Sequence, residues 1–276
     1  MQHDSTTMYR FGDAFELTLL TDDPALARRA DHAGVDRIGL DLERIGKTER
    51  QAGHDTRLSD HRITDLPMIG AAIGKAALFA RLNPLHDRSR DEIETALSLG
   101  AKILMLPYFS IAREVEAFAS AVARRAHVVI LVETAQALTR MRDILAVDGI
   151  DEVMAGLNDL HLDLGVRNHF EVLVSPLIDV LAAETRRAGL RFSVGGVTSP
   201  DDALPIPPDL VLAQYPRLHA TGAWLSRSFL RHLSADRSFS TEVASIRRRL
   251  TEWAAMPSSE LEGARDQLAA YARSIS

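Results

Sequence analysis

Two acidic residues stand at matching places within residues 128–165, and together they could bind a metal ion. Glu133 follows an apolar, β-branched run at 128–132, which predicts a buried parallel strand. Asp159 closely follows a second apolar run, at 153–155. In a parallel α/β barrel the carboxyl ends of the strands share one face, where active sites are built, so we expect the two carboxylates to converge. Their oxygens suit a hard dication, Mg²⁺ or Mn²⁺, with Co²⁺ as a further candidate.

A second acidic pair, Asp41 and Glu43, follows the predicted strand at 35–40. Residues two apart in an extended chain point to the same side, so these carboxylates should lie together. Acids beside a dication can orient a hydroxide or relay a proton, which makes both residues catalytic candidates. The plain alternative is that Glu43 only pairs with Arg44 or Lys47 in the loop that follows.

Candidates for binding the substrate lie at one further predicted strand end and in the turn directly before Asp159. Arg81 belongs to a predicted strand at 76–82, where its guanidinium could bind a carboxylate or a developing enolate through two hydrogen bonds. We therefore assign it both a catalytic and a binding role. The turn made by Gly156, Leu157 and Asn158 enters a helix, and its backbone N–H groups could receive a carboxylate.

Each of these assignments has a structural alternative. Glu133 could be an ordinary acid at the start of a helix, and Asp159 an ordinary acid in a turn. Arg81 could be only the partner of a salt bridge. Taken together, their positions at strand ends favour a shared site over three separate local roles.

Residues 46–65 form a long polar segment that predicts an active-site loop with one helical turn. The loop and its entrance are basic within an acidic protein. Arg44 and Lys47 are candidates for binding the distal, anionic part of a substrate, whereas a purely solvated loop is the alternative.

The elements that would position these residues alternate between strand and helix. The predicted strands lie at 15–20, 35–40, 76–82, 102–106, 128–132, 153–155, 191–194 and 209–213. This pattern predicts a (β/α)₈ TIM barrel over residues 1–234 as the catalytic domain. Residues 235–276 depart from it and predict two helices, at 240–255 and 259–274, with more apolar surface than a free tail would expose. We expect them to contact another subunit of a homo-oligomer, and packing back on the barrel is the alternative.

Composition limits the class of protein. A chain of 276 residues is long enough for one such barrel. A net charge of −6 gives no general attraction to nucleic acid or to an anionic membrane. The absence of cysteine excludes disulfides, thiol catalysis and cysteine-bound zinc. The polar start and the lack of a long apolar run lead us to expect a cytoplasmic protein without a membrane span.

Four motifs, the first of them a pair of segments, resemble one known family. The segments VETAQAL and AVDGIDEVMAGLNDLHLDLG are similar to those of the HpcH/HpaI aldolase and citrate lyase β-subunit family, and so are GVDRIGLDLER, RLNPL and LGAKILMLPYF upstream. The resemblance covers about two thirds of the chain in the expected order. It implies that Glu133 and Asp159 hold a divalent metal, that an acid pair lies close by, and that Arg81 binds substrate.

The chain departs from this family at one position. The pyruvate-aldolase branch typically has a histidine base directly after the acid pair, and the citrate-lyase-like branch has an acid there. This sequence has Arg44 instead. The identity of the general base therefore stays open, with His54 and His61 of the loop as candidates.

These residues favour enolate chemistry on a 2-oxo acid. A bound dication would chelate the carboxylate and carbonyl oxygens, and Arg81 would add positive charge to them. A Schiff-base aldolase would need a lysine at a strand tip, whereas Lys75 and Lys102 stand at strand starts. We therefore predict a metal-dependent carbon–carbon lyase or aldolase whose co-substrate is an aldehyde or a thioester. A CoA-thioester lyase of the citryl or malyl kind and a non-catalytic binder of metal and oxo acid are the alternatives.

Overall fold

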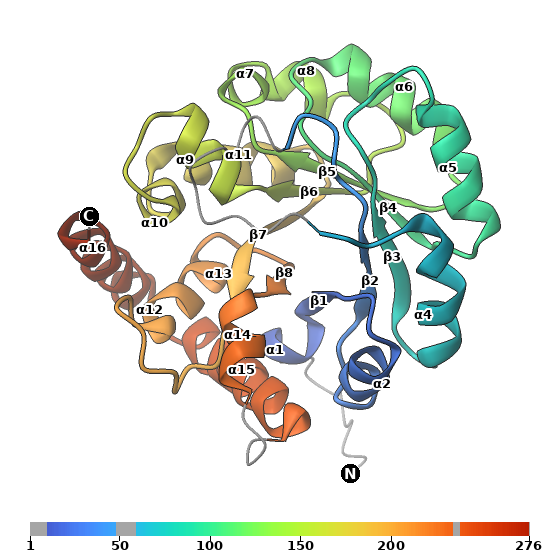
Figure 1. Ribbon diagram of the computed structural model, residues 1–276. Coiled ribbons are helices and arrows are strands. Elements are labelled where there is room, and N and C mark those ends of the chain that lie inside the picture. The colour runs from blue at the N-terminus through green and yellow to red at the C-terminus, as the bar shows by residue number, and fades with distance from the viewer. Residues whose placement is uncertain (1–9, 48–58, 234–237, 276) are drawn as a thin grey trace, which may run out of the picture.

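The protein is a closed barrel of eight parallel strands in sequence order, each paired with the next and β8 paired with β1. The computed structural model describes residues 10–47, 59–233 and 238–275. The strands are β1 (Glu16–Leu20), β2 (Arg37–Asp41), β3 (Ala77–Arg81), β4 (Ile103–Leu106), β5 (His127–Val132), β6 (Glu152–Ala155), β7 (Arg191–Val197) and β8 (Gly222–Leu225). The predicted TIM barrel is confirmed, with the strands at the centre of Figure 1 and the helices around them.

Helices connect and cover the strands. They are α1 (Phe11–Ala14), α2 (Pro24–His32), η1 (Ile63–Asp65), α4 (Leu66–Ala72), α5 (Ser89–Ser98), α6 (Ala112–Val122), α7 (Ala135–Thr139), α8 (Met141–Leu145), α9 (Leu157–Asp163), α10 (His169–Leu173), α11 (Pro176–Arg187), α12 (Pro208–Leu212), α13 (Gln214–Arg217), α14 (Arg227–His232), α15 (Phe239–Ala254) and α16 (Ser258–Ser274). The short 3₁₀ helix η1 falls in the segment where one helical turn was predicted. Between β5 and β6 the chain forms two short helices, α7 and α8, which are separated at Arg140.

The predicted eighth strand at 209–213 is wrong. These residues lie in α12, and the eighth strand is Gly222–Leu225. Pro208 occupies the first position of α12, where its fixed φ favours a helix, and Leu212 is buried between this helix and the barrel. A short apolar run of this kind cannot be assigned to strand or helix from periodicity alone.

The interior of the barrel is apolar in its middle and charged at both ends. One apolar cluster fills it, made of Phe79, Ile103, Met105, Val129, Leu131 and Met154. A larger cluster packs the outer faces of the strands against the helices. Alternate residues of a strand share a face, so β3 places Arg81 above Phe79 and β5 places Glu133 above Leu131. The strands that fill the core therefore also present charged groups at the carboxyl mouth.

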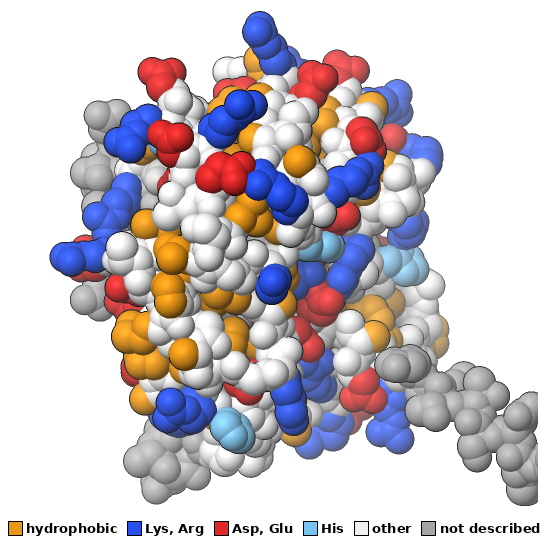
Figure 2. Space-filling model, turned by 90° about the vertical axis from the view of Figure 1, so that its right-hand side faces the viewer, with side chains coloured by type: hydrophobic (Ala, Val, Ile, Leu, Met, Phe, Trp, Pro, Cys, Tyr) orange, Lys and Arg blue, Asp and Glu red, His pale blue; other side chains and the backbone are white. Residues whose placement is uncertain are grey.

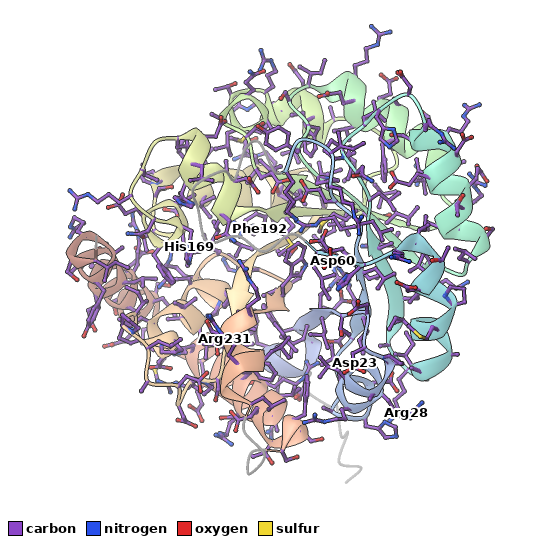
Figure 3. The ribbon with its side chains drawn as sticks, viewed as in Figure 1. Asp23, Arg28, Asp60, His169, Phe192 and Arg231 are labelled. Atoms are coloured by element: carbon purple, nitrogen blue, oxygen red, sulfur yellow. The ribbon has the colours of Figure 1, made fainter. Side chains whose placement is uncertain are left out.

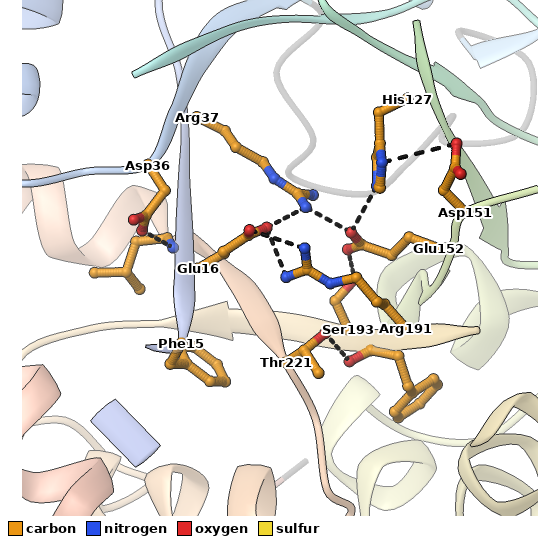
Figure 4. Close-up of polar contacts among 12 residues, drawn as sticks. Phe15, Glu16, Asp36, Arg37, His127, Asp151, Glu152, Arg191, Ser193 and Thr221 are labelled. Carbon is orange, nitrogen blue, oxygen red and sulfur yellow. Dashed lines mark hydrogen bonds and ion pairs between the residues drawn. The ribbon is translucent and has the colours of Figure 1, made fainter. Parts of the chain in front are cut away.

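A network of ion pairs, with Arg37 and Glu152 buried at its centre, closes the opposite end of the barrel, at the strand starts (Figure 4). Arg37 bridges Glu16 and Glu152, and its Nη2 lies 2.7 Å from Glu152 Oε2. Ser193 Oγ donates to Glu152 at 2.7 Å, and Arg191 pairs with Glu16 at 2.8 Å. A cavity of about 10 Å³ between this layer and the apolar core has room for about one water. Because active sites of such barrels are built at the carboxyl ends of the strands, we treat this network at the opposite end as structural.

The C-terminal helices pack against the barrel. Arg247 of α15 donates to the carbonyl oxygens of Gly12, Phe15 and Gly34 at 2.7–2.8 Å and so ties this helix to the start of the chain. Helix α16 contacts α10, α12 and α13, as Figure 1 shows. Leu250 and Leu268 are fully buried in these contacts. Packing back on the barrel, the alternative prediction, thus accounts for much of their apolar surface, and contact with a second subunit stays a prediction.

The surface is mixed in charge where it can be seen. On the face shown in Figure 2, basic and acidic side chains are interspersed. Such a face presents no broad field of one sign to a polyanion. Among the described residues, no helix combines the length and the apolar character needed to cross a membrane.

Candidate active site

A buried arginine and two carboxylates meet at the ends of β2 and β3. Asp41 and Arg81 are paired residues of the two strands, so their side chains leave the barrel side by side. Arg81 Nε and Nη2 donate to the two oxygens of Asp41 at 2.8 and 2.6 Å, and Nη1 lies 3.3 Å from Glu43 Oε2. Glu43 is fully buried, and Asp41 and Arg81 are less than a tenth exposed. The structure therefore brings together the three residues that were predicted to be catalytic.

This arrangement fixes the charges of the pair. Burial alone would raise the pKa of Asp41, but Arg81 and then Lys47 outweigh it and hold that pKa well below its ordinary value. Burial opposes the charge of Arg81 as well, yet Asp41 and Glu43 raise its pKa further. Both groups are thus ionised at neutral pH. Asp41 is consequently a poor proton acceptor and serves to hold the arginine.

An indole ring supports the arginine from inside the barrel. The guanidinium carbon of Arg81 lies 4.9 Å from the ring centroid of Trp224 on β8. Trp224 also packs on the apolar cluster of the barrel interior. A cation over an indole face is favourable, and the stacking restricts the plane of the guanidinium.

Glu133 projects from the end of β5 into the same region and is 2% exposed. Its Oε1 accepts the backbone N–H of Tyr108 at 2.9 Å. Tyr108 has a φ of 46°, an uncommon conformation for a bulky residue that aims its N–H at the carboxylate. Gly156 makes room from the other side, since a Cβ there would lie 2.7 Å from Glu133 Cβ and 2.8 Å from Oε2. The Tyr108 N–H and the missing side chain of Gly156 therefore fix the position of Glu133.

Asp159 lies in the first turn of α9, directly after β6, and is 8% exposed. Its charge reaches Glu133: burial first, then repulsion by Glu43 and Asp159, raise the pKa of Glu133 well above its ordinary value, despite the opposing effect of Arg81. Three carboxylates therefore share one buried volume with too little positive charge to balance them.

These groups fit a divalent cation. With all side chains ionised, the carboxylates of Asp41, Glu43, Glu133 and Asp159 face two cations, Arg81 and Lys47, which leaves an excess of two negative charges. Among residues 10–47, 59–233 and 238–275 no group of three or more histidine or acidic side chains is close enough to hold a metal by itself. Magnesium sites commonly use one or two carboxylates, with water and substrate completing the shell. Glu133 and Asp159 are suitable as such a pair.

The turn after β6 matches its predicted role only in part. The N–H of Gly156 already donates to the carbonyl of Val132 at 2.9 Å, so it is not available to a substrate. Leu157 is buried and Asn158 is exposed, and both lie in the first turn of α9, where backbone N–H groups lack partners within the helix. Binding of a carboxylate by these two residues stays a prediction.

Lys47 and Arg44, predicted together as ligands of a distal anion, lie in different surroundings. Asn83 Oδ1 accepts the N–H groups of Arg44 and Ile45 at 2.8 and 3.1 Å, and this turns the chain back over the mouth through Gly46, whose φ is 71°. Lys47 is 5% exposed as a result and faces the acid pair. Arg44 is exposed, and its guanidinium donates to the carbonyl of His61 at 3.1 Å.

The candidate base His61 lies next to the site, where it is hydrogen-bonded to the backbone of Asp41. Its Nδ1 accepts the backbone N–H of Asp41 at 3.0 Å, and its Nε2 lies 3.6 Å from Asp22 Oδ1. Asp60, labelled in Figure 3, belongs to the same segment, which passes over the barrel in that view. The other candidate base, His54, lies outside the described residues.

Three contributors to the site were not predicted: Asn83, Tyr108 and Trp224. Asn83 stands within the RLNPL motif, directly after the strand that carries Arg81, and this position could have drawn attention to it. Tyr108 acts through a backbone conformation that its side-chain type disfavours. Trp224 lies on the strand that was placed wrongly in the sequence, and so it was not considered.

The sequence matches one family over most of its length. The model of the HpcH/HpaI aldolase/citrate lyase family matches residues 16–192, which include every residue of the site from Asp41 to Asp159. None of the curated proteins compared with the chain matches it.

Solved structures of low sequence identity share the fold. An HpcH/HpaI aldolase from Desulfitobacterium hafniense is 17% identical, with a TM-score of 0.60 over 80% of this chain and 89% of that one. An HpcH/HpaI aldolase/citrate lyase family protein from Burkholderia cenocepacia is 18% identical, with a TM-score of 0.60 over 87% and 95% of the two chains. The citrate synthase SbnG is 18% identical, with a TM-score of 0.60 over 81% and 91%. These likenesses show a common barrel, and the family match shows more: the chain belongs to the HpcH/HpaI aldolase/citrate lyase family of lyase- and aldolase-type enzymes.

Proposed function

We propose that the protein is a divalent-metal-dependent carbon–carbon lyase of the aldolase type that acts on a 2-oxo acid. The observation that supports this most is the meeting of Arg81 with the carboxylates of Asp41, Glu43 and Glu133 at the carboxyl mouth of the barrel. A buried cation that keeps donors for a substrate oxygen can stabilise the enolate of an oxo acid. The acids in excess beside it could hold a dication, which would add to that positive charge.

Arg81 would bind the oxygens on which negative charge develops. A guanidinium has five N–H donors, of which two are hydrogen-bonded to Asp41. The third nitrogen, Nη1, faces Glu43. Nη1 and Nη2 each carry two N–H groups, so each keeps one donor for the substrate. Asp41 and Trp224 hold the guanidinium in one plane, and this pre-organisation reduces the cost of ordering it when the substrate binds.

Glu133 and Asp159 would hold the metal. Bound there, Mg²⁺ or Mn²⁺ would supply Lewis-acid polarisation of the oxo acid. The role of the chain itself is to keep both carboxylates buried, in a medium where charge–charge interactions are stronger than in water. The Tyr108 N–H fixes one oxygen of Glu133, so the side chain has one preferred orientation.

In the cleavage direction, the bond between the carbon next to the oxo group and the carbinol carbon breaks. Its electron pair forms the enolate that Arg81 stabilises, while the carbinol oxygen loses its proton and becomes a carbonyl. The co-substrate is thus an aldehyde or, in the alternative, a thioester. Assembly into a homo-oligomer and location in the cytoplasm remain proposals.

Decarboxylation of oxaloacetate tests the central step, because it forms the enolate of pyruvate by loss of CO₂ and requires no hydroxyl proton to be removed. We expect oxaloacetate to be decarboxylated faster by the wild-type protein with Mn²⁺ than by Mn²⁺ alone or by the Glu133→Gln variant with Mn²⁺. Glu152→Gln, a buried glutamate at the far end of the barrel, is the matched control and should retain activity. Equal rates for wild type and Glu133→Gln would contradict the proposal. Metal binding without any catalysis would favour the non-catalytic alternative.

A further inference from the structure

We propose that Lys47 carries the proton that leaves the substrate hydroxyl during carbon–carbon cleavage and returns it during bond formation. This inference rests on the proposed function and adds to it the group that the acid pair lacks.

Lys47 is built into the site. Its Nζ lies 3.1 Å from Asp41 Oδ2 and 3.1 Å from Glu43 Oε2. The same two carboxylates also pair with Arg81, the group that would bind the enolate. Only these carboxylates separate the ammonium from the guanidinium. Asn83 fixes the turn that brings Lys47 there, through two hydrogen bonds to backbone N–H groups. A lysine of a solvated loop would need neither its burial nor this support.

The other candidates near the pair are engaged elsewhere. Arg44 points its guanidinium at the carbonyl of His61, and an arginine does not give up a proton in a protein. His61 uses Nδ1 to accept the N–H of Asp41 and directs Nε2 toward Asp22. Both oxygens of Asp41 already accept hydrogen bonds from Arg81, at 2.8 and 2.6 Å.

The use of lysine in this chain supports the assignment. The sequence has only three lysines, and arginine supplies nearly all of its other positive charge. Lys75 and Lys102 are exposed and precede β3 and β4, at the opposite end of the barrel. Lysine and arginine can both neutralise a carboxylate, but only lysine readily exchanges a proton. Lys47, the one lysine at the mouth, therefore provides a readily exchanged proton, which the arginines of this chain do not.

The proton transfer balances in both directions. In cleavage, neutral Lys47 takes the proton of the carbinol hydroxyl, and the electrons of the O–H bond form the new carbonyl bond. The carbon–carbon bond breaks, and its electron pair passes to the enolate. In bond formation, the enolate carbon attacks the carbonyl carbon, and the resulting alkoxide takes a proton from the Lys47 ammonium. Exchange with solvent restores the starting form in either case.

The charged groups that face Nζ are Asp41 and Glu43 from the end of β2, with Arg81 of β3 behind them. Cleavage uses the neutral amine of Lys47, so it should become faster as the pH rises. Decarboxylation of oxaloacetate involves no hydroxyl proton and should lack this rise. The difference between the two pH profiles is a property that a purely structural lysine would not create.

The test compares two probe substrates, oxaloacetate and racemic 4-hydroxy-2-oxopentanoate, with Mn²⁺ present. In the Lys47→Arg variant, which keeps the positive charge, we expect cleavage of the hydroxy acid to fall about 10²–10⁴-fold, the usual contribution of a general acid or base. Decarboxylation should stay within a few-fold of wild type. Lys102→Arg is the matched control and should change neither rate. Should the arginine disturb the fold, Lys47→Ala with added ethylammonium is the second variant, and the amine should restore cleavage.

The outcomes separate this inference from the proposed function. If the wild-type protein acts on neither probe, the proposed function fails. If wild type and Lys47→Arg cleave the hydroxy acid equally fast, the role of Lys47 is wrong while the proposed function stands. Decarboxylation without any cleavage by the wild type would also overturn the role of Lys47. A parallel loss of both rates in Lys47→Arg, with no rescue of Lys47→Ala, would show a structural lysine and reject the proposal.

Discussion

Replacing Glu133 with glutamine should make the metal-free protein more stable, whereas the same change at Glu152 should make it less stable. Both glutamates are almost fully buried. Burial and the acids Glu43 and Asp159 raise the pKa of Glu133. Burial also opposes the charge of Glu152, but His127, Arg37 and Ser193 overcome it and lower the pKa of this residue to about 2. Carboxylates that repel one another at an empty cation site destabilise the folded protein until the cation binds. A carboxylate in a structural ion pair does not.

The structure sets the size of each effect. A pKa lowered from 4.5 to about 2 corresponds to about 3 kcal/mol at neutral pH, at about 1.4 kcal/mol per pKa unit, and Glu152→Gln would lose this contribution. Glu133→Gln removes a repelled charge and keeps an oxygen for the Tyr108 N–H, so we expect a gain of about 1–2 kcal/mol. This gain corresponds to a rise in Tm of about 2–8 °C.

The dependence on pH has opposite signs at the two sites. Glu133 has a raised pKa, so its cost is absent at low pH and appears as the pH rises through its folded-state value. The advantage of Glu133→Gln should therefore vanish on acidification. Glu152 has a lowered pKa, so its contribution is complete above its unfolded value of 4.5 and disappears as the pH falls toward 2.

Thermal unfolding in EDTA, followed by circular dichroism over a pH series, measures both variants against the wild type. Added Mn²⁺ should then stabilise the wild type and Glu152→Gln but leave Glu133→Gln unchanged. The reasoning is refuted if Glu133→Gln in EDTA unfolds at a lower temperature than the wild type, by as much as Glu152→Gln does.

Three further changes test other parts of the account. Arg81→Ala should weaken pyruvate binding in the presence of Mn²⁺ by about 1.5–3 kcal/mol in calorimetry, and an unchanged affinity would remove its assigned role. Gly156→Ala should displace Glu133 and weaken Mn²⁺ binding at least tenfold without unfolding the barrel, because the added Cβ meets that side chain at 2.7 Å; tight Mn²⁺ binding by this variant would contradict the packing. Arg247→Ala should lower the free energy of urea unfolding by about 2–4 kcal/mol, because three carbonyl oxygens lose a charged donor; a loss below 0.5 kcal/mol would show that α15 is not held in this way.

The residues at the strand ends were predictable because two simple regularities determine them. Side chains alternate along a strand, and parallel strands in a barrel end on one face. Asp41 and Arg81 follow directly from these rules, and so does the placement of Glu133 at the end of β5. No knowledge of long-range packing was needed beyond the barrel itself.

Other parts of the site depend on contacts that no local pattern encodes. The burial of Lys47 depends on a hydrogen bond from the chain after β2 to Asn83 after β3, and composition indicated only a polar loop. Trp224 was missed because α12 has the apolar run of a buried strand, while the true β8 has only four residues, one of them glycine. Likewise, the apolar faces of the last two helices were evident in the sequence, but the surface that covers them was not.

The measurement that tests the central claim most directly is exchange of the pyruvate methyl protons with D₂O, followed by NMR with and without Mg²⁺ or Mn²⁺. It needs no knowledge of the second substrate, and it reports formation of the enolate itself. The account predicts metal-dependent exchange by the wild type, and loss of that exchange in a Glu133→Gln, Asp159→Asn double variant that remains folded. Wild-type protein with bound metal that exchanges no methyl protons, or a double variant that exchanges as fast as wild type, would contradict it.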